Sequence, residues 1–431
     1  MVGIKYQEII WIMIANYLGL CYDEKRKKMT QFKRPLTTIM QRIVIELNRS
    51  KWGEANMDIQ SFLADLEYLV NIDSGSEDSE GLHRVADFFS QRFQALGWLV
   101  KEYDLAPNPG RCVVCANREA EHYDLMLMGH LDTVFPRGTC GKVPFRIEGD
   151  KAFGPGVSDM KDGSLLIYYL MKDLPKEINE KLNILVFYNP DEETGSMSSR
   201  PIYQEYAKKT DFAYVYESWL PDGSRCVERY GSIEMNIAFT GRAGHCGYVF
   251  TNGAKSAVSE MARWIVKLDS LQSRERNTTV NIGIAQGGTK PNVVAEQAHI
   301  TIDIRYSDPA DVQRTEIMVE QLTEEAQSRE IGVEIKMKRV KPSLVPTEKG
   351  WKYIHHVEKL AENHDMENVF SPQGGLSDAN YLAQWDVICM DGLGPKGDKE
   401  HSLDEYMDIK SVIPAYDFSK MLIQDLAEQK R

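Results

Sequence analysis

A buried strand that ends in two polar side chains constrains the fold of this chain more than any other feature of its sequence. Residues 125–136 read LMLMGHLDTVFP, an apolar run followed by a turn. A continuous apolar run of this length is typical of a strand covered on both faces. The run delivers His130 and Asp132 at its end, and burying either one without a partner costs about 2–7 kcal/mol. We therefore expect a partner for both, and a metal ion is one candidate.

The segments around this strand alternate between helical and strand patterns. Predicted helices lie at 58–72, 82–97 and 161–174, and predicted strands at 99–105, 112–117, 123–129 and 182–190. Strands that alternate with helices of this length predict an α/β sheet with helices on both faces. Because 431 residues exceed what one hydrophobic core usually serves, we expect two domains.

The sequence pattern changes between residues 227 and 341. Strands with period-two alternation are predicted at 232–241, 279–288 and 298–308, and helices at 252–271 and 309–330. This set predicts a small α+β sandwich, and the α/β pattern resumes at 350–364 and closes with a helix at 413–429. We therefore predict an N-terminal extension over 1–55, a first domain over 56–226 and 342–431, and a second domain inserted over 227–341.

Charge and cysteine content exclude some functions. A net charge of -13 and a pI near 5.3 argue against nucleic-acid and anionic-membrane partners, which need clustered Lys and Arg. Seven scattered cysteines do not form a disulfide framework in a chain of this length. Cys112 and Cys115 lie three apart in a predicted strand, so their side chains should face opposite ways. We predict reduced thiols and a cytoplasmic location.

An apolar run at 9–20, IIWIMIANYLGL, needs a separate interpretation. It resembles the apolar part of a signal peptide, but no A-x-A cleavage site follows it. It is also too short to span a bilayer comfortably. We favour a peripheral amphipathic helix or an upstream extension of the true start, and expect no stable membrane association.

Acidic residues and histidines recur directly after predicted strands or turns. They are His130 and Asp132 in GHLD, Asp159 in GPGVSDMKDG, Glu192 and Glu193 in NPDEETGS, Glu217 in YVYES, and His401 in KEHSLDEYMD. Each one alone has an ordinary explanation, such as a helix cap or a solvated surface pair. In open α/β sheets, however, ligands bind at the carboxyl ends of the strands. Five segments of the same chemistry at these ends favour one shared site.

Histidine nitrogens and carboxylate oxygens are ligands suited to zinc, and manganese or cobalt would also fit. A single catalytic zinc keeps about three protein ligands and an open position. The predicted set exceeds that number and suits two metals about 3.5–4 Å apart that share a carboxylate. Asp132, two residues beyond His130, is placed to orient its imidazole toward a metal ion.

Taken in order, these motifs resemble the zinc-dependent superfamily of glutamate carboxypeptidase, acetylornithine deacetylase, succinyl-diaminopimelate desuccinylase and aminoacylase. The stretches GHLDTVFPRGT, PFRIEGDKAFGPGVSDMKDG and DEETGS most resemble the glutamate carboxypeptidase branch. The resemblance covers about residues 57 to 425. It implies a zinc-exopeptidase-like catalytic domain, with a mixed sheet flanked by helices, and a lid or dimerisation domain as the insert.

The resemblance also implies a role for each site residue. Asp159 would bridge two Zn²⁺ ions, with His130 and Glu217 on one ion and Glu193 and His401 on the other. Glu192 would be the general base, and Asp132 would support His130. His245, from the insert, would reach over the scissile carbonyl, in this family often from the partner subunit of a homodimer. Asn292, Arg305 and Gly375 would lie on the substrate side.

The residues themselves leave some of these roles open. Arg305 could hold a substrate carboxylate with its two-pronged guanidinium or pair with Asp303. His245 could donate to the oxyanion or be a loop histidine with a local bond. Departures from the carboxypeptidase branch are CGYVFTNG after His245, and Lys341-Pro342 where Arg-Pro often stands. Both bear on side-chain specificity.

We therefore predict a dizinc metallohydrolase that cleaves an amide bond in a small peptide or N-acyl amino acid, as a glutamate carboxypeptidase-like exopeptidase. An N-acyl-amino-acid deacylase is the main alternative, since its chemistry is identical. A non-catalytic relative would be expected to have lost Glu192 or a ligand, and all are present. A single-metal hydrolase would use only some of the ligands.

Overall fold

The structure is a computed structural model that describes residues 57–220, 222–364, 366 and 369–430. The predicted extension over 1–55, with its apolar run at 9–20, lies outside the described residues. Within the described ranges, no helix combines the length and the apolarity needed to cross a membrane.

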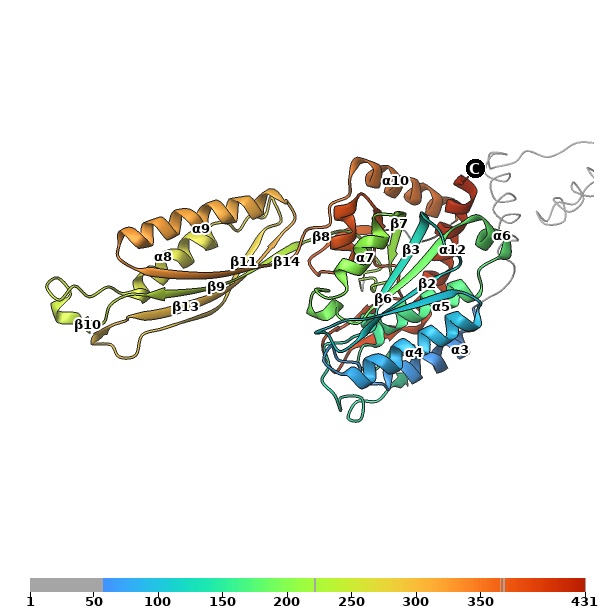
Figure 1. The fold of residues 1–431 in the computed structure, drawn as a ribbon, viewed down its shortest axis with the longest axis horizontal. Helices are drawn as coiled ribbons and strands as arrows, with labels where there is room; N and C mark the ends of the chain where they lie inside the picture. The colour runs from blue at the N-terminus through green and yellow to red at the C-terminus, as the bar shows by residue number, and fades with distance from the viewer. Residues whose placement is uncertain (1–56, 221, 365, 367–368, 431) are drawn as a thin grey trace, which may run out of the picture. The chain divides into compact units, whose positions relative to one another are not determined.

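A six-stranded mixed sheet forms the larger layer of the fold (Figure 1). In spatial order it consists of β1 (Leu99–Asp104), β2 (Arg111–Ala116), β6 (Ile184–Asn189), β3 (Tyr123–His130), β7 (Thr210–Val215) and β16 (Ile388–Met390). The pairs β1–β2 and β2–β6 are antiparallel, and β6–β3, β3–β7 and β7–β16 are parallel. The apolar run that ends in His130 is therefore the inner strand β3.

Helices cover both faces of this sheet. Successive side chains of β3 therefore point into two different cores, one on each face. Leu125 and Leu127 pack with α3 (Ile59–Val70), α4 (Ser79–Ala95), α5 (Asp162–Lys172), α10 (Glu348–Asn363) and α12 (Val412–Gln429). Met126 and Met128 pack with α7 (Arg200–Ala207) and α11 (Ala379–Leu382). Each fully buried side chain of this size contributes about 1.5–3 kcal/mol. The predicted α/β class, with a mixed sheet flanked by helices, is confirmed.

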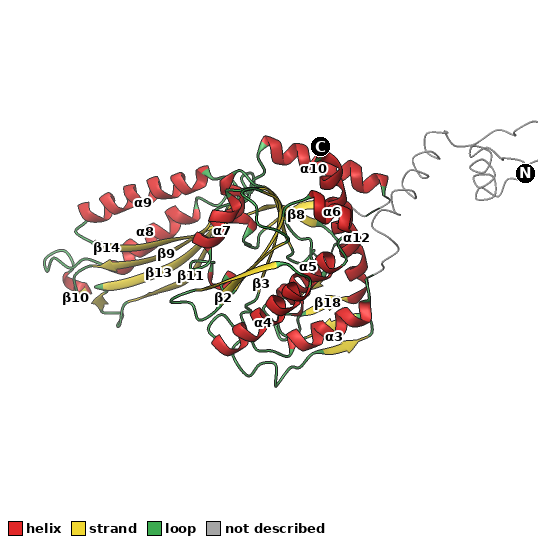
Figure 2. Ribbon diagram, turned by 45° about the vertical axis from the view of Figure 1, so that its right-hand side comes forward, coloured by secondary structure: helices red, strands yellow, loops and turns green. Residues whose placement is uncertain are grey.

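A second, antiparallel sheet carries the inserted sequence. Its order is β11 (Thr279–Gly287), β13 (Gln297–Tyr306), β9 (Gly231–Thr240) and β14 (Gly332–Lys341). Ile233, Met235, Ile237 and Phe239 alternate along β9 into a core formed with α8 (Ala257–Asp269) and α9 (Ala310–Ser328). Both helices cover the same face of the strands (Figure 2). The predicted α+β layer is present, and β14 is a strand that the sequence analysis did not name.

A small four-stranded sheet brings two distant loops together. Its strands are β4 (Arg146–Glu148), β5 (Lys151–Phe153), β17 (Gly397–Asp398) and β18 (Tyr406–Asp408), and β5 pairs with β18. The turn that carries Asp159 follows β5, and the loop that carries His401 connects β17 to β18. The pairing therefore places both loops at one end of the same sheet.

The two cysteines of the CxxC pair lie in different cores. Cys112 of β2 packs with Met126 and Met128, whereas Cys115 packs with Leu125 and Leu127. The six cysteines in the described ranges are free thiols. The prediction that this pair faces opposite ways is confirmed.

Candidate metal centre

The carboxyl ends of three neighbouring parallel strands meet at one edge of the mixed sheet. His130 is the last residue of β3 and lies opposite Asn189, the last residue of β6. Glu193 follows β6 by four residues, and Glu217 follows β7 by two. This is the edge at which open α/β sheets bind ligands. The sheet thus delivers three predicted ligands to one place.

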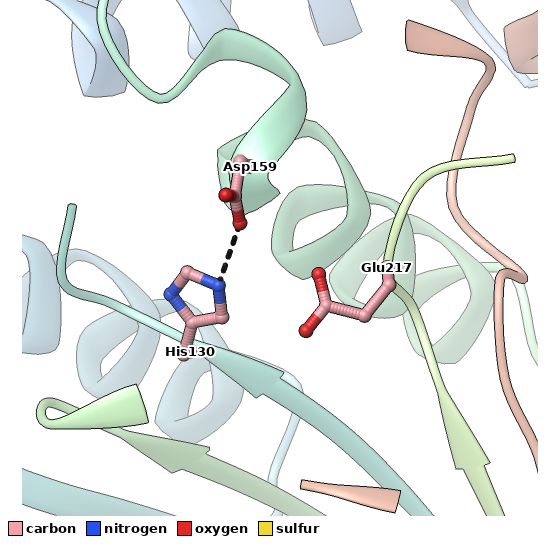
Figure 3. A group of neighbouring side chains, drawn as sticks. All are labelled: His130, Asp159 and Glu217. Atoms are coloured by element: carbon pink, nitrogen blue, oxygen red, sulfur yellow. Dashed lines mark hydrogen bonds and ion pairs between the residues drawn. The ribbon is translucent and has the colours of Figure 1, made fainter. Parts of the chain in front are cut away.

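Asp159 is shared by two groups of possible ligand atoms. One nitrogen or oxygen from each of His130, Asp159 and Glu217 lies within 4.8 Å of the others, and the same holds for Asp159, Glu193 and His401. The side chains of the first group point toward one another (Figure 3). His130 Nε2 lies 3.0 Å from Asp159 Oδ1, and His401 Nε2 lies 3.1 Å from Asp159 Oδ2. The two carboxylate oxygens of Asp159 therefore face different groups.

The electrostatics of these groups suit divalent cations. Burial, followed by the charge of Asp159, raises the pKa of Glu193 to about 7. Burial also raises the pKa of Glu217 well above its ordinary value. Hydrogen bonds to Asp159 and Glu193 raise the pKa of His401 to about 11. Buried carboxylates crowded in this way need compensating positive charge, and imidazole nitrogens with carboxylate oxygens form a donor set suited to zinc, manganese or cobalt. The residues fit a metal centre.

Asp132 supports the centre from behind. His130 Nδ1 lies 3.0 Å from the main-chain oxygen of Asp132 and 3.4 Å from its Oδ1. The carboxylate of Asp132 also accepts the backbone N–H groups of Glu192 (3.1 Å) and Glu193 (3.2 Å) and the hydroxyl of Ser76 (2.7 Å). Asp132 therefore holds the turn Glu192–Thr194, called the glutamate turn below, as well as the imidazole of His130. Only the contact with the imidazole was predicted from the sequence.

Glu192 and Glu193 lie on a 3₁₀ turn, Glu192–Thr194, rather than on an extended segment. Asp191 holds this turn, because its carboxylate accepts the N–H groups of Ser198 (2.8 Å) and Ser199 (3.2 Å). Adjacent residues of a 3₁₀ turn differ by about 120° in direction. Glu193 consequently joins the second ligand group, whereas Glu192 turns toward Lys341.

Lys341 is a site residue whose partner the sequence analysis did not identify. Its Nζ pairs with Glu192 Oε1 and lies 3.7 Å from Asp378 Oδ1. Asp378 is itself held by Asn189 Nδ2 at 2.9 Å. Burial raises the pKa of Glu192, and the charge of Lys341 opposes this increase. The only sequence signal was the Lys-Pro pair at the end of the insert.

Besides Asp132 and Glu192, four predicted residues lie outside the two ligand groups. His245 is exposed, and its Nδ1 accepts the N–H of Gly247 at 3.1 Å. Asn292 lies nearby, since its main-chain oxygen accepts the N–H of Cys246 at 3.2 Å. His245 ends β10 (Gly244–His245), which pairs with β12 (Val293–Val294) next to Asn292. Both strands lie beyond the Thr240 end of β9, which is about 30 Å from Gly231 at 3.4 Å per residue. His245 and Asn292 are therefore neighbours of each other on the insert, and not members of the ligand groups.

The other two substrate-side predictions have neighbours of their own. Arg305 forms a two-pronged pair with Asp303, at 2.7 Å from Nε and 3.0 Å from Nη2. Asp303 is one of the two partners that the sequence left open for Arg305. Gly375 lies beside Arg229, where a Cβ would be 3.4 Å from Nη1. Arg229 is buried and pairs with Asp391 Oδ2 at 2.5 Å.

A cavity of about 1250 Å³ opens next to the second ligand group. Glu193 and Thr194 form one part of its lining. The start of α4 with its preceding loop and the stretch from Thr133 to Arg137 form the rest. Glu193 thus connects the second ligand group to a space large enough for a small substrate.

Comparison with known proteins places this geometry in a family. Residues 126–425 match the family described as peptidase family M20/M25/M40. The chain is 30% identical over 370 residues to carboxypeptidase G2 of Pseudomonas sp. (strain RS-16), covering 85% of this chain and 89% of that relative. It is 26% identical over 270 residues to acetylornithine deacetylase of Vibrio cholerae serotype O1 (strain ATCC 39541 / Classical Ogawa 395 / O395), covering 58% and 69%.

The fold agrees with the sequence comparison. The structure of aminopeptidase PepT from Bacillus cereus ATCC 10987 matches with a TM-score of 0.72 at 19% identity, covering 86% of this chain and 100% of that one. The family match spans most of the residues from β3 to α12. The chain belongs to peptidase family M20/M25/M40 and is a metal-dependent peptidase or amidohydrolase.

Proposed function

We propose that this protein is a dinuclear metallohydrolase that cleaves an amide bond of a small carboxylate-bearing substrate, as a glutamate carboxypeptidase-like exopeptidase. The observation that carries the proposal is the position of Asp159, whose two carboxylate oxygens face separate ligand groups. The relative with 30% identity, carboxypeptidase G2, supports the carboxypeptidase assignment.

Two zinc ions are the proposed cofactors, with cobalt and manganese as substitutes. His130, Asp159 and Glu217 would hold the first ion, and Asp159, Glu193 and His401 the second. Divalent ions held there would polarise the scissile carbonyl and lower the pKa of the attacking water. Asp132 would keep the ligands His130 and Glu193 in place, because it contacts both the imidazole and the glutamate turn.

Glu192 is the proposed general base, since it lies beside the ligand groups without belonging to either. Its carboxylate would take a proton from the attacking water and pass it to the leaving amine nitrogen. The raised pKa that burial gives Glu192 suits this task, because a base works best when its pKa lies near the working pH. Lys341 would orient the carboxylate through its ion pair.

A homodimer is part of the proposal. His245 and Asn292 lie at the end of the insert opposite its junction with the rest of the chain, where the exposed ring of His245 lies beside Gly247 and Tyr248. A second copy could bring this pair to the scissile carbonyl. Arg305 would then bind the substrate carboxylate by exchanging it for Asp303, with Gly375 leaving room for the substrate backbone.

The deciding experiment is a substrate panel run with zinc, cobalt and manganese, together with metal analysis of the purified protein. We expect about two ions per chain and faster turnover of dipeptides with a C-terminal glutamate than of N-acetyl amino acids. The opposite preference would favour a deacylase, which the similarity to acetylornithine deacetylase makes the second candidate. One ion per chain with full activity would contradict the dinuclear mechanism.

A further inference from the structure

The turn that carries Asp159 is irregular and needs support from outside. Gly156, just before it, has a left-handed backbone with φ 69°, and Asp159 itself has the non-helical angles φ -120° and ψ 91°. The backbone N–H groups of an irregular turn, like those of the first turn of a helix, have no internal partners and must find other acceptors. The position of Asp159 therefore depends on whichever groups accept those hydrogen bonds.

Glu405 is that acceptor. Its Oε2 accepts the N–H of Gly156 at 2.9 Å, and its Oε1 accepts those of Ser158 at 2.8 Å and Asp159 at 3.0 Å. Glu405 is only 1% exposed, so water does not compete for these bonds. One buried carboxylate thus holds three backbone groups of the Asp159 turn.

Glu405 also belongs to the loop that carries His401. Both Lys399 and His401 have left-handed backbones with φ 63°, a conformation that residues other than glycine adopt at a cost in energy. The loop is held by its own bonds, since Lys399 accepts the N–H of Ser402 at 3.1 Å and Ser402 accepts that of Glu405 at 3.2 Å. The side chain of Glu405 therefore connects the loop of one ligand directly to the turn of another.

A separate contact links the same turn to the third ligand strand. The hydroxyls of Ser158 and Ser218 lie 2.6 Å apart, and Ser218 donates to the main-chain oxygen of Ser158 at 2.7 Å. Ser218 directly follows Glu217, which belongs to the first ligand group. The Asp159 turn is thus bonded to Ser218, next to Glu217 of the first ligand group, and to Glu405, in the loop of His401 of the second group.

We propose that Glu405 is a positioning residue of the metal centre, which fixes the Asp159 turn against the His401 loop so that each oxygen of Asp159 faces its own group. The inference rests on the proposed function, since it gives Glu405 a role in holding two metal ions. It concerns metal affinity rather than the hydrolytic step.

The test compares Glu405→Gln with Asp404→Asn. Asp404 lies in the same loop with an exposed side chain, so its variant makes the same charge change without touching the turn. Glutamine can keep the two bonds to one oxygen, but its amide group then faces the N–H of Gly156, where the third acceptor is lost. The metal-free full-length proteins are titrated with Co²⁺ and followed by visible absorption, and their thermal midpoints are measured without metal.

We expect the Co²⁺ dissociation constant of Glu405→Gln to rise about 10–100-fold, with altered absorption bands. Asp404→Asn should bind like the wild type. Equal affinity and spectra in all three proteins would overturn the inference while leaving the proposed function intact. Failure of the wild type to bind two ions would instead overturn the proposed function and the inference with it. If the melt shows that Glu405→Gln is unfolded, Glu405→Asp replaces it under the same criterion, because the shorter side chain keeps the charge but not the reach.

Discussion

The ammonium of Lys341 and the carboxylate of Glu192 form a buried ion pair between residues 149 positions apart in the chain. Lys341 is the last residue of β14, so the pair ties the end of the insert to the glutamate turn. Asp378 lies on the other side of the ammonium, at 3.7 Å. One buried cation therefore compensates two buried carboxylates.

Replacing Lys341 by methionine should destabilise the protein strongly. The variant keeps a side chain of similar length but leaves Glu192 and Asp378 without a counter-charge. Breaking a buried ion pair from one side costs about 3–5 kcal/mol. The free energy of unfolding measured in urea should fall by about that amount, and less in Lys341→Arg, which retains the charge. Equal stability of Lys341→Met and the wild type would contradict the compensation by this ammonium.

Removing bound metal should lower the thermal midpoint, and Asp159→Asn should abolish this effect. A ligand at 100 times its dissociation constant stabilises the folded state by about 2.7 kcal/mol. The measurement is the midpoint with saturating zinc and after chelation, in both proteins. Asp159 contributes to both ligand groups, so its amide variant should show little difference between the two conditions. If chelation lowers the thermal midpoint of Asp159→Asn as much as that of the wild type, Asp159 does not hold both metal ions.

Glu192→Gln should lose activity without losing metal. Glutamine has nearly the same shape as glutamate but cannot accept and release a proton at neutral pH. Removal of a general base typically costs about 10²–10⁴ in rate. We expect kcat to fall within this range while the metal content per chain stays unchanged, because Glu192 is in neither ligand group. Undiminished kcat in a metal-loaded preparation would exclude Glu192 as the base.

A buried carboxylate in the insert should make stability depend on pH. Burial alone would raise the pKa of Glu260, but hydrogen bonds and charges from Arg329 and Arg263 outweigh it, and the pKa is lowered. Arg329 contacts both carboxylate oxygens at 2.7 Å. A lowered pKa means that the folded state favours the ionised form, so this contribution is present above the unfolded value of about 4.3 and is lost as the pH falls through the folded value.

The matching variant is Glu260→Gln. Hydrogen bonds to charged groups contribute about 1.5–3 kcal/mol, so the variant should be less stable than the wild type by a similar amount at pH 7. The difference should shrink as the pH falls below the unfolded value of about 4.3, because the unfolded state then binds a proton that the folded state still excludes. Urea unfolding at several pH values measures it. A difference that does not change with pH would show that the charge of Glu260 is not what stabilises the insert.

The sequence predicted the fold class well because two local signals agreed. Period-two alternation in residues 232–241 and the apolar run at 125–136 each require a particular covering layer, and both layers are present. The rule that parallel strands end at one edge then brought His130, Glu193 and Glu217 together. Their roles as metal ligands stay predictions, as do the domain boundaries.

Contacts between distant segments could not be predicted in the same way. Glu405 meets the turn at Asp159 across 246 residues, and no periodic pattern marks an acidic side chain as buried. Glu192 and Glu193 lie on a 3₁₀ turn, and the carboxylates of Asp132 and Asp191 accept backbone N–H groups of that turn and of the segment after it. In both cases the deciding interaction is a carboxylate that accepts backbone N–H groups of a neighbouring loop.

The register of β9 with β14 sets how far apart the two ends of the insert are. The chain enters the inserted sheet at Gly231 and leaves it at Lys341, and Lys341 is paired with Ser232. Paired residues of antiparallel strands have Cα atoms only about 4.5–5.5 Å apart, so entry and exit are next to each other. A linker that replaced the insert would therefore need to bridge only one strand spacing between Gly231 and Lys341.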